Sequence, residues 1–177
     1  MHMNKSQAEV DDCVRNFLDG IVVKNKNDLI ALKNLIDKKI EFRPYNNETK
    51  VSADNIQWKR TALEIITDGY VYKGKACSDI ALVFLMLCKA MGIDGYLVKL
   101  RTLDNSNTHT IVEVKLNDGW YRFDPSMKDG VPSHGQLADD QIWNAKWLGG
   151  WKIWKRGKDL KELGLSSIDD ESKIREA

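Results

Sequence analysis

The fold is decided by the stretch HTIVEVKLNDGWYRFDP, residues 109–125. On both sides of Asn117-Asp118-Gly119, apolar side chains alternate with polar ones, and a period of two residues predicts β-strands. The Asp-Gly pair tolerates the positive φ that a tight turn needs, so the two strands are expected to form an antiparallel hairpin. The second strand should end at Asp124-Pro125, because proline cannot donate a hydrogen bond to a sheet.

The length of the turn decides whether His109 and Asp124, at the open end of the hairpin, can meet. A four-residue loop would pair Lys115 with Trp120. His109 and Asp124 would then share a face one diagonal apart, with about 7–8 Å between their backbones. A strict two-residue loop, Asp118-Gly119, would double the offset and put contact out of reach without a bulge. The hypothesis that the two residues act together therefore requires the longer or bulged turn.

Helical periodicity dominates the chain before the hairpin. Apolar side chains recur at three- and four-residue steps over about residues 6–21, 29–40 and 52–67, which predicts three amphipathic helices. A fourth helix, expected from about Cys77 to Met91, is apolar on nearly all sides and must therefore be central. Alternation over residues 96–101 predicts a further strand. The expected fold class is α+β, with the central helix packed on an antiparallel sheet of at least three strands.

The C-terminal part of the chain is rich in tryptophan. Four of the six tryptophans have spacings that would place them on one face of a helix: Trp143, Trp147, Trp151 and Trp154. Because Gly149-Gly150 interrupts this pattern, we expect a helix through about Trp147 and then a loop or extended segment. The polar stretch 166–177 is expected to be a frayed tail. Core packing and an exposed aromatic binding surface are both open interpretations of the tryptophans.

Length and composition favour a single domain. The 177 residues carry 27 Lys and Arg against 26 Asp and Glu, a net charge of +1, which excludes the basic footprint of a nucleic-acid binder. Residues 1–50 are expected to be the N-terminal helical part and 51–130 the core that holds the candidate reactive residues. Residues 131–165 would be a Trp-rich segment of the same domain, followed by the tail at 166–177.

The sequence carries no signal for a membrane or a metal. The longest wholly apolar run, residues 80–88, has nine residues, whereas a spanning helix needs roughly 20. The start of the chain lacks the apolar segment of a signal peptide. Three histidines and three cysteines without a C-x-x-C pair are too few for a zinc site. We therefore expect a cytoplasmic protein with no cofactor and with neither membrane nor nucleic-acid partners.

The candidate chemistry centres on Cys77, His109 and Asp124. Cys77 lies where a loop enters the central helix, and the positive end of a helix favours a thiolate over a thiol. Asp124 could orient the imidazole of His109, which would take the thiol proton and later protonate a leaving amine. The thiolate would attack a carbonyl carbon, and the backbone N–H of Cys77 is a candidate donor to the oxyanion.

These residues lie in motifs that resemble the transglutaminase-like superfamily, whose core shares the papain-like cysteine-protease architecture. Gly74-Lys-Ala-Cys77-Ser-Asp79-Ile-Ala81 is similar to the family's Gly-x-Cys-x-Asp/Glu-aromatic-Ala block, with one extra residue before the cysteine. His109-Thr-Ile-Val-Glu113-Val114 resembles His-Ala-Trp-x-Glu-Val. Gly119-Trp120-Tyr-Arg-Phe-Asp124-Pro125 resembles Gly-Trp-x-x-Asp-Pro with one extra residue. The match covers about residues 52–127, with its blocks in the family's order.

The resemblance implies a papain-like fold and a cysteine-dependent acyl-transfer enzyme with Cys77, His109 and Asp124 as its catalytic triad. The expected activity is that of a peptidase or amidase on peptide or isopeptide amides; transglutaminase or deamidase activity would use the same acyl-enzyme. Trp120 and Trp151 are expected to contact a peptide or protein substrate. The alternative is a catalytically silent protein of this fold that acts as a binding or scaffold module, with the cysteine as a small buried side chain.

Overall fold

The computed structural model describes residues 7–145 and 149–176. Its helices are α1 (Gln7–Leu18), α2 (Lys26–Lys39), α3 (Lys50–Ile56), α4 (Ala62–Asp68), α5 (Ala76–Ala90), α6 (Leu160–Leu163), the 3-10 helix η1 (Ile168–Asp170) and α7 (Glu171–Glu176). Its strands are β1 (Glu41–Arg43), β2 (Tyr70–Tyr72), β3 (Gly95–Thr102), β4 (Thr108–Leu116), β5 (Gly119–Phe123), β6 (Ser133–His134), β7 (Trp143–Ala145) and β8 (Gly149–Gly157). The expected α+β class is confirmed.

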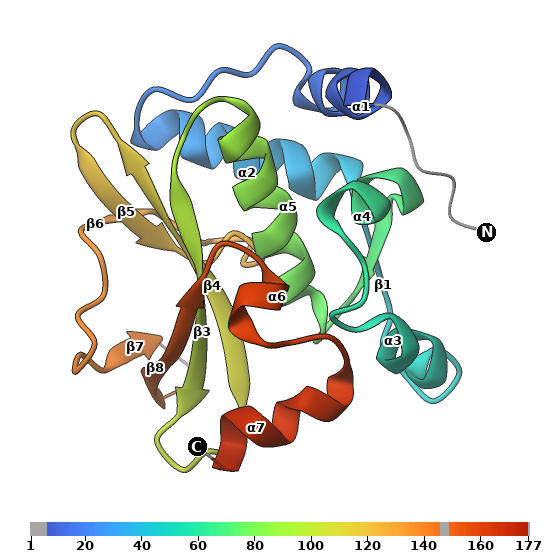
Figure 1. The fold of residues 1–177 in the computed structure, drawn as a ribbon, viewed down its shortest axis with the longest axis vertical. Coiled ribbons are helices and arrows are strands. Elements are labelled where there is room, and N and C mark those ends of the chain that lie inside the picture. The colour runs from blue at the N-terminus through green and yellow to red at the C-terminus, as the bar shows by residue number, and fades with distance from the viewer. Residues whose placement is uncertain (1–6, 146–148, 177) are drawn as a thin grey trace.

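A six-stranded antiparallel sheet forms one layer of the molecule, with the strand order β6-β5-β4-β3-β8-β7. The remaining two strands, β1 and β2, form a small parallel pair. Figure 1 shows α5 between the large sheet and the other N-terminal helices, and α5 contacts both β4 and α4. The predicted central helix on an antiparallel sheet is therefore confirmed. No helix in the described part of the chain is long and apolar enough to span a membrane.

Both faces of the central strands are buried. The main core joins α5 to one face of the sheet, where Leu97, Val112 and Val114 are fully buried. A smaller core on the other face consists of Val98, Leu100, Ile111, Leu137 and Trp151. Because both faces are covered, a polar residue in β3 or β4 that alternates with apolar ones need not be solvated.

The hairpin has the register that brings His109 and Asp124 to one face. Lys115 pairs with Trp120, as the four-residue loop requires, and the pairing continues to Leu116 opposite Gly119. The connecting loop is thus Asn117-Asp118 rather than Asp118-Gly119, and Gly119 has a φ of 134°. A glycine at this position lets the chain enter β5 without shifting the pairing.

The single helix expected over residues 52–67 is wrong, because the chain breaks between α3 and α4. Trp58 interrupts it with a φ of 60°, a left-handed conformation that is uncommon for an aromatic residue. The indole N–H of Trp58 donates to Ser78 at 3.1 Å, and the side chain is buried. Thr61 then starts α4 with a capping box to Glu64. Burial of the Trp58 side chain therefore outweighs the helical periodicity.

The helix expected through Trp147 is also wrong. Residues 143–145 form β7, which pairs with β8, and Trp147 itself lies outside the described residues. β8 in turn pairs with β3, so it satisfies backbone groups that an edge strand would leave open. Gly149 begins β8 with a φ of 73°. The backbone pairing of β8 with β3 therefore outweighs the helical spacing of the tryptophans.

The polar C-terminal stretch is not frayed over residues 168–176, where the chain forms η1 and α7. Asp170 accepts hydrogen bonds from the backbone N–H groups of Ser166 and Ser167. Ile174 is fully buried in the main core, and Arg101 donates to its carbonyl oxygen at 3.1 Å. One apolar side chain and one backbone contact therefore dock a segment that composition alone assigns to solvent.

Replacing Ile174 by Ala should lower the free energy of unfolding by about 2–5 kcal/mol, because it leaves a cavity in the core. The matched control is Arg175→Ala on the same helix, which loses only an exposed ion pair with Glu171 and should change stability by less than about 0.5 kcal/mol. Chemical denaturation measures both values. Equal, near-zero effects would mean that α7 does not pack in solution.

Candidate active site

Cys77 is the second residue of α5, and its side chain is partly exposed. Gly74, with a φ of 77°, lets the loop after β2 turn into the helix. Lys75 is the N-cap and makes no side-chain cap bond, so the N–H groups of the first turn are not satisfied by a capping side chain. The thiol therefore lies at the positive end of a helix of fifteen residues, as the sequence predicts.

His109 and Asp124 are in direct contact. The Nε2 atom of His109 hydrogen-bonds to one carboxylate oxygen of Asp124, and both side chains are largely buried. The other oxygen of Asp124 accepts from the backbone N–H and the hydroxyl of Ser126, at 2.8 and 2.6 Å. With Nε2 held by the carboxylate, Nδ1 is the nitrogen free to exchange a proton with a thiol.

Cys77 and His109 are close enough to change each other's protonation. Burial raises the pKa of the Cys77 thiol, but the charge of His109, a hydrogen bond with His109 and the charge of Lys99 together lower it to about 7. For His109, burial lowers the pKa, whereas the Cys77 thiolate and Asp124 raise it to about 10. Between these two values the pair exists as thiolate and imidazolium, the form that a cysteine nucleophile needs.

Two tryptophans enclose the imidazole. The ring of Trp143 on β7 stacks parallel to His109 at 6.3 Å between centroids, and Trp151 on β8 lies at 5.6 Å with a tilt of 48°. Trp151 is only 2% exposed, so it forms a wall of the site and presents little surface to a substrate. The C-terminal hairpin thus shields the His109–Asp124 hydrogen bond from water.

Trp120, the other expected substrate contact, is not brought to the thiol. It pairs with Lys115 near the turn of the hairpin and stacks on Tyr96 at 5.8 Å. Lys115 is six residues along β4 from His109, a separation of about 20 Å at the rise of a strand. The residues that the structure gathers at one point are therefore Cys77, His109 and Asp124, with Trp151 beside them.

Several polar residues that the sequence analysis did not identify surround the first turn of α5. The hydroxyl groups of Ser78 and Thr110 are 2.7 Å apart and fully buried. Lys99 of β3 extends to the same two hydroxyls and is 1% exposed. The sequence gives little indication that these residues belong to a site. Alternation in β3 predicts that Lys99 lies on a solvated face, and it is internal only because another layer of the structure covers that face.

One buried and one half-buried ion pair hold this framework together. Arg60, just after the break at Trp58, donates to Asp79 of α5 at 2.7 Å, and both side chains are about 7% exposed. On the other face of the sheet, fully buried Glu113 accepts from Arg156 of β8 at 2.9 Å. Asp79 and Glu113 therefore support the structure around the site and do not face the thiol.

The side chains gathered here are of the kind that supports covalent catalysis by a cysteine sulfur. Among residues 7–145 and 149–176, no group of three or more His, Cys, Asp and Glu side chains is placed to hold a metal ion. The Cys77 thiolate can attack an electrophilic carbon, and the imidazolium of His109 can return a proton to a leaving group. The backbone N–H groups at the start of α5 are available to a developing negative charge.

Comparison with known proteins identifies a family profile and solved structures that resemble this chain. Residues 15–125 match the profile of the transglutaminase-like superfamily. The crystal structure of a candidate cysteine protease from Cytophaga hutchinsonii aligns with a TM-score of 0.53 and 15% identity, over 90% of this chain and 46% of that one. A protein described as a TGase aligns with a TM-score of 0.52 and 10% identity, over 79% and 38% of the two chains.

Legionella pneumophila LapG, treated with EGTA, aligns at a TM-score of 0.49 and 15% identity, over 96% of this chain and 98% of that one. A search of curated protein sequences finds no match. The chain spans less than half the length of the two structures with the higher TM-scores, and at these identities the likeness demonstrates a shared fold.

Alkylation by iodoacetamide should be fast at Cys77 alone. Because the pKa of its thiol is lowered to about 7, the rate should be half-maximal near that pH, and His109→Ala should move the midpoint upward. Cys88 is the internal control, since it is fully buried and burial raises the pKa of its thiol. Mass spectrometry assigns the rates; Cys77 labelling no faster than Cys88 would contradict the arrangement.

Proposed function

Because the chain belongs to the transglutaminase-like superfamily, we propose that it is a cysteine-dependent acyl-transfer enzyme that hydrolyses peptide or isopeptide amides through Cys77, His109 and Asp124. One observation supports this most strongly: the ring of His109 is hydrogen-bonded to Asp124 and lies close enough to Cys77, at the start of a helix, for each to shift the pKa of the other. A packed, structural cysteine has no need of an imidazolium and a carboxylate in series.

The proposed reaction has two halves. The Cys77 thiolate attacks the amide carbon and forms a C–S bond, while the carbonyl oxygen takes the negative charge beside the backbone N–H of Cys77. His109 then donates its proton to the amide nitrogen, the C–N bond breaks and an amine leaves. In the second half, His109 takes a proton from water, the resulting hydroxide attacks the thioester, and the acid departs with the thiol restored as thiolate.

Transamidation would differ only in the second half, where a primary amine attacks the same thioester. We favour hydrolysis because it needs no second binding site beyond the acyl-enzyme. Deamidation is hydrolysis in which the amide that reacts is that of a glutamine side chain.

The test uses labelled casein for hydrolysis and a glutaminyl peptide with hydroxylamine for amine transfer. Cys77→Ala should abolish both activities, and Asp124→Asn should lower kcat by at least about 100-fold because the imidazole loses its orientation and charge partner. Cys13→Ala, which changes a cysteine of α1 outside the site, is the matched control and should retain full activity.

Mass spectrometry of the quenched reaction should find the acyl adduct on Cys77. Activity that survives Cys77→Ala would contradict the proposed mechanism. If no acyl adduct forms with either substrate and Cys77 resists alkylation, the chain is the catalytically silent binding module instead.

A further inference from the structure

Lys99 is a buried cation beside the first turn of α5, where Cys77 lies. Its ammonium nitrogen lies 3.2 Å from the Thr110 hydroxyl and 3.5 Å from the Ser78 hydroxyl. It also lies 4.6 Å from the centre of the Trp58 ring, in cation–π geometry. Only 1% of the residue is exposed. Strand β3 shifts its register against β8 between Lys99 and Leu100, a bulge of the kind that redirects a side chain next to a functional site.

The surroundings of Lys99 offer it hydroxyls rather than a carboxylate. Within the part of the chain that the structure describes, its hydrogen-bond partners are the two neutral hydroxyls, and no carboxylate is in ion-pair contact with it. An ammonium group without an opposite charge is expensive to bury. Burial lowers the pKa of Lys99, and the negative charges that oppose this effect are those of Cys77 and Glu171. Cys77, on the first turn of α5 beside Ser78, is therefore the anion that can balance Lys99.

We propose that Lys99 is a positioning residue of the acyl-transfer reaction, whose buried positive charge behind the first turn of α5 keeps Cys77 in the thiolate form. This inference rests on the proposed function, because it needs Cys77 to be the nucleophile. Lys99 acts through Cys77 and through the hydroxyls of Ser78 and Thr110, without contact with the substrate.

Charge balance in the interior supports this role. When the catalytic pair is ionised, Cys77 and Asp124 are negative and His109 is positive, which leaves one uncompensated negative charge in a largely buried site. Lys99 supplies the missing positive charge, so the ionised site is neutral. A neutral ionised site carries a smaller desolvation penalty than a charged one.

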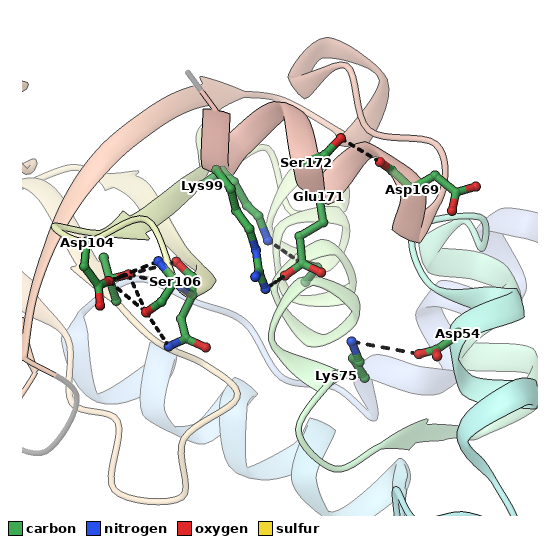
Figure 2. Close-up of polar contacts among 12 residues, drawn as sticks. Asp54, Lys75, Lys99, Asp104, Ser106, Asp169, Glu171 and Ser172 are labelled. Atoms are coloured by element: carbon green, nitrogen blue, oxygen red, sulfur yellow. Dashed lines mark hydrogen bonds and ion pairs between the residues drawn. The ribbon is translucent and has the colours of Figure 1, made fainter.

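Other charged groups near Lys99 lie closer to solvent. Figure 2 shows Lys99 and Glu171 extending into the same region in front of α5, and the Glu171 side chain is 25% exposed and already paired with Arg175. The positive charge of Lys75 repels that of Lys99, but Lys75 pairs with Asp54 at 3.9 Å (Figure 2). Because solvent screens exposed charges more than buried ones, the charge of Lys99 should affect the protonation of the Cys77 thiol more than the charges of Glu171 and Lys75 do.

The position of Lys99 is fixed by strained backbone at Trp58. The left-handed φ of 60° at Trp58 turns its indole under the ammonium group and its N–H toward Ser78. Such a conformation persists only where neighbouring contacts over-determine it, and it is concentrated at functional sites. The break between α3 and α4 thus places the Trp58 ring against Lys99, behind the first turn of α5 that carries Cys77.

The experiment measures the pH midpoint of Cys77 alkylation by iodoacetamide in the full chain. Lys99→Met removes the charge at similar volume and should raise the midpoint by about one unit, which is tenfold less thiolate below it. The same rise should occur in a His109→Ala background, because the two cations act separately on the sulfur. Lys33→Met is the matched control: Lys33 is also buried, at 2% exposure, but on α2 and bonded to Asp37. Its midpoint should equal that of the wild type.

A second variant separates charge from packing. Lys99→Gln keeps a hydrogen-bond donor but no charge, so it should also raise the midpoint, and it serves in place of Lys99→Met if that variant does not fold. The rise should persist in about 1 M salt, because a buried charge is poorly screened.

A folded Lys99 variant with an unchanged midpoint would overturn the inference while leaving the proposed function intact. If the wild type itself shows no midpoint below the ordinary thiol range, the proposed function fails first and the inference falls with it. Melting curves identify which variants are folded; a variant that gains stability and shifts the midpoint supports a role in chemistry over one in folding.

Discussion

One buried hydrogen bond sets the geometry of the site: the Ser78 hydroxyl lies 2.7 Å from the Thr110 hydroxyl. Each of these residues directly follows a candidate catalytic residue, Cys77 on α5 and His109 on β4. Because the two hydroxyls are held together, the start of α5 is held against the start of β4. The rest of the fold, from the apolar packing of α5 on the sheet to the ion pair between Arg60 and Asp79, serves to hold these two segments in contact.

The electrostatics of the site follow from the same contact. A thiol at a helix start is favoured as thiolate, and an imidazole held by a buried carboxylate is favoured as imidazolium, so the two forms stabilise each other. Burial opposes both ions. The arrangement works because opposite charges are paired at short range and, in the proposal made above for Lys99, a buried cation faces the thiolate. The tryptophans of β7 and β8 then keep water from the paired groups.

Local patterns were sufficient to predict the central helix and the hairpin, because each depends on residues close in sequence. The register of the hairpin depends on the length of its turn, which the sequence left open between two alternatives. The shared face of His109 and Asp124 follows from strand periodicity once Lys115 pairs with Trp120. The break at Trp58 and the interior position of Lys99 could not be predicted, because both depend on Ser78, which is about twenty residues away in the chain from each of them. The strand at 143–145 was missed for the same reason, whereas an extended segment after Trp147 was one of the two expected outcomes; the pairing of residues 149–157 with β3 depends on contacts distant in sequence.

The central claim is that Cys77 and His109 form a thiolate–imidazolium pair in the resting protein. The most direct measurement is the NMR spectrum of the His109 ring nitrogens at about pH 8.5, where a free histidine is neutral. The account predicts a doubly protonated ring in the wild type and a neutral ring in Cys77→Ala, because the thiolate raises the pKa of the imidazole. A neutral ring in the wild type, unchanged by the substitution, would contradict it.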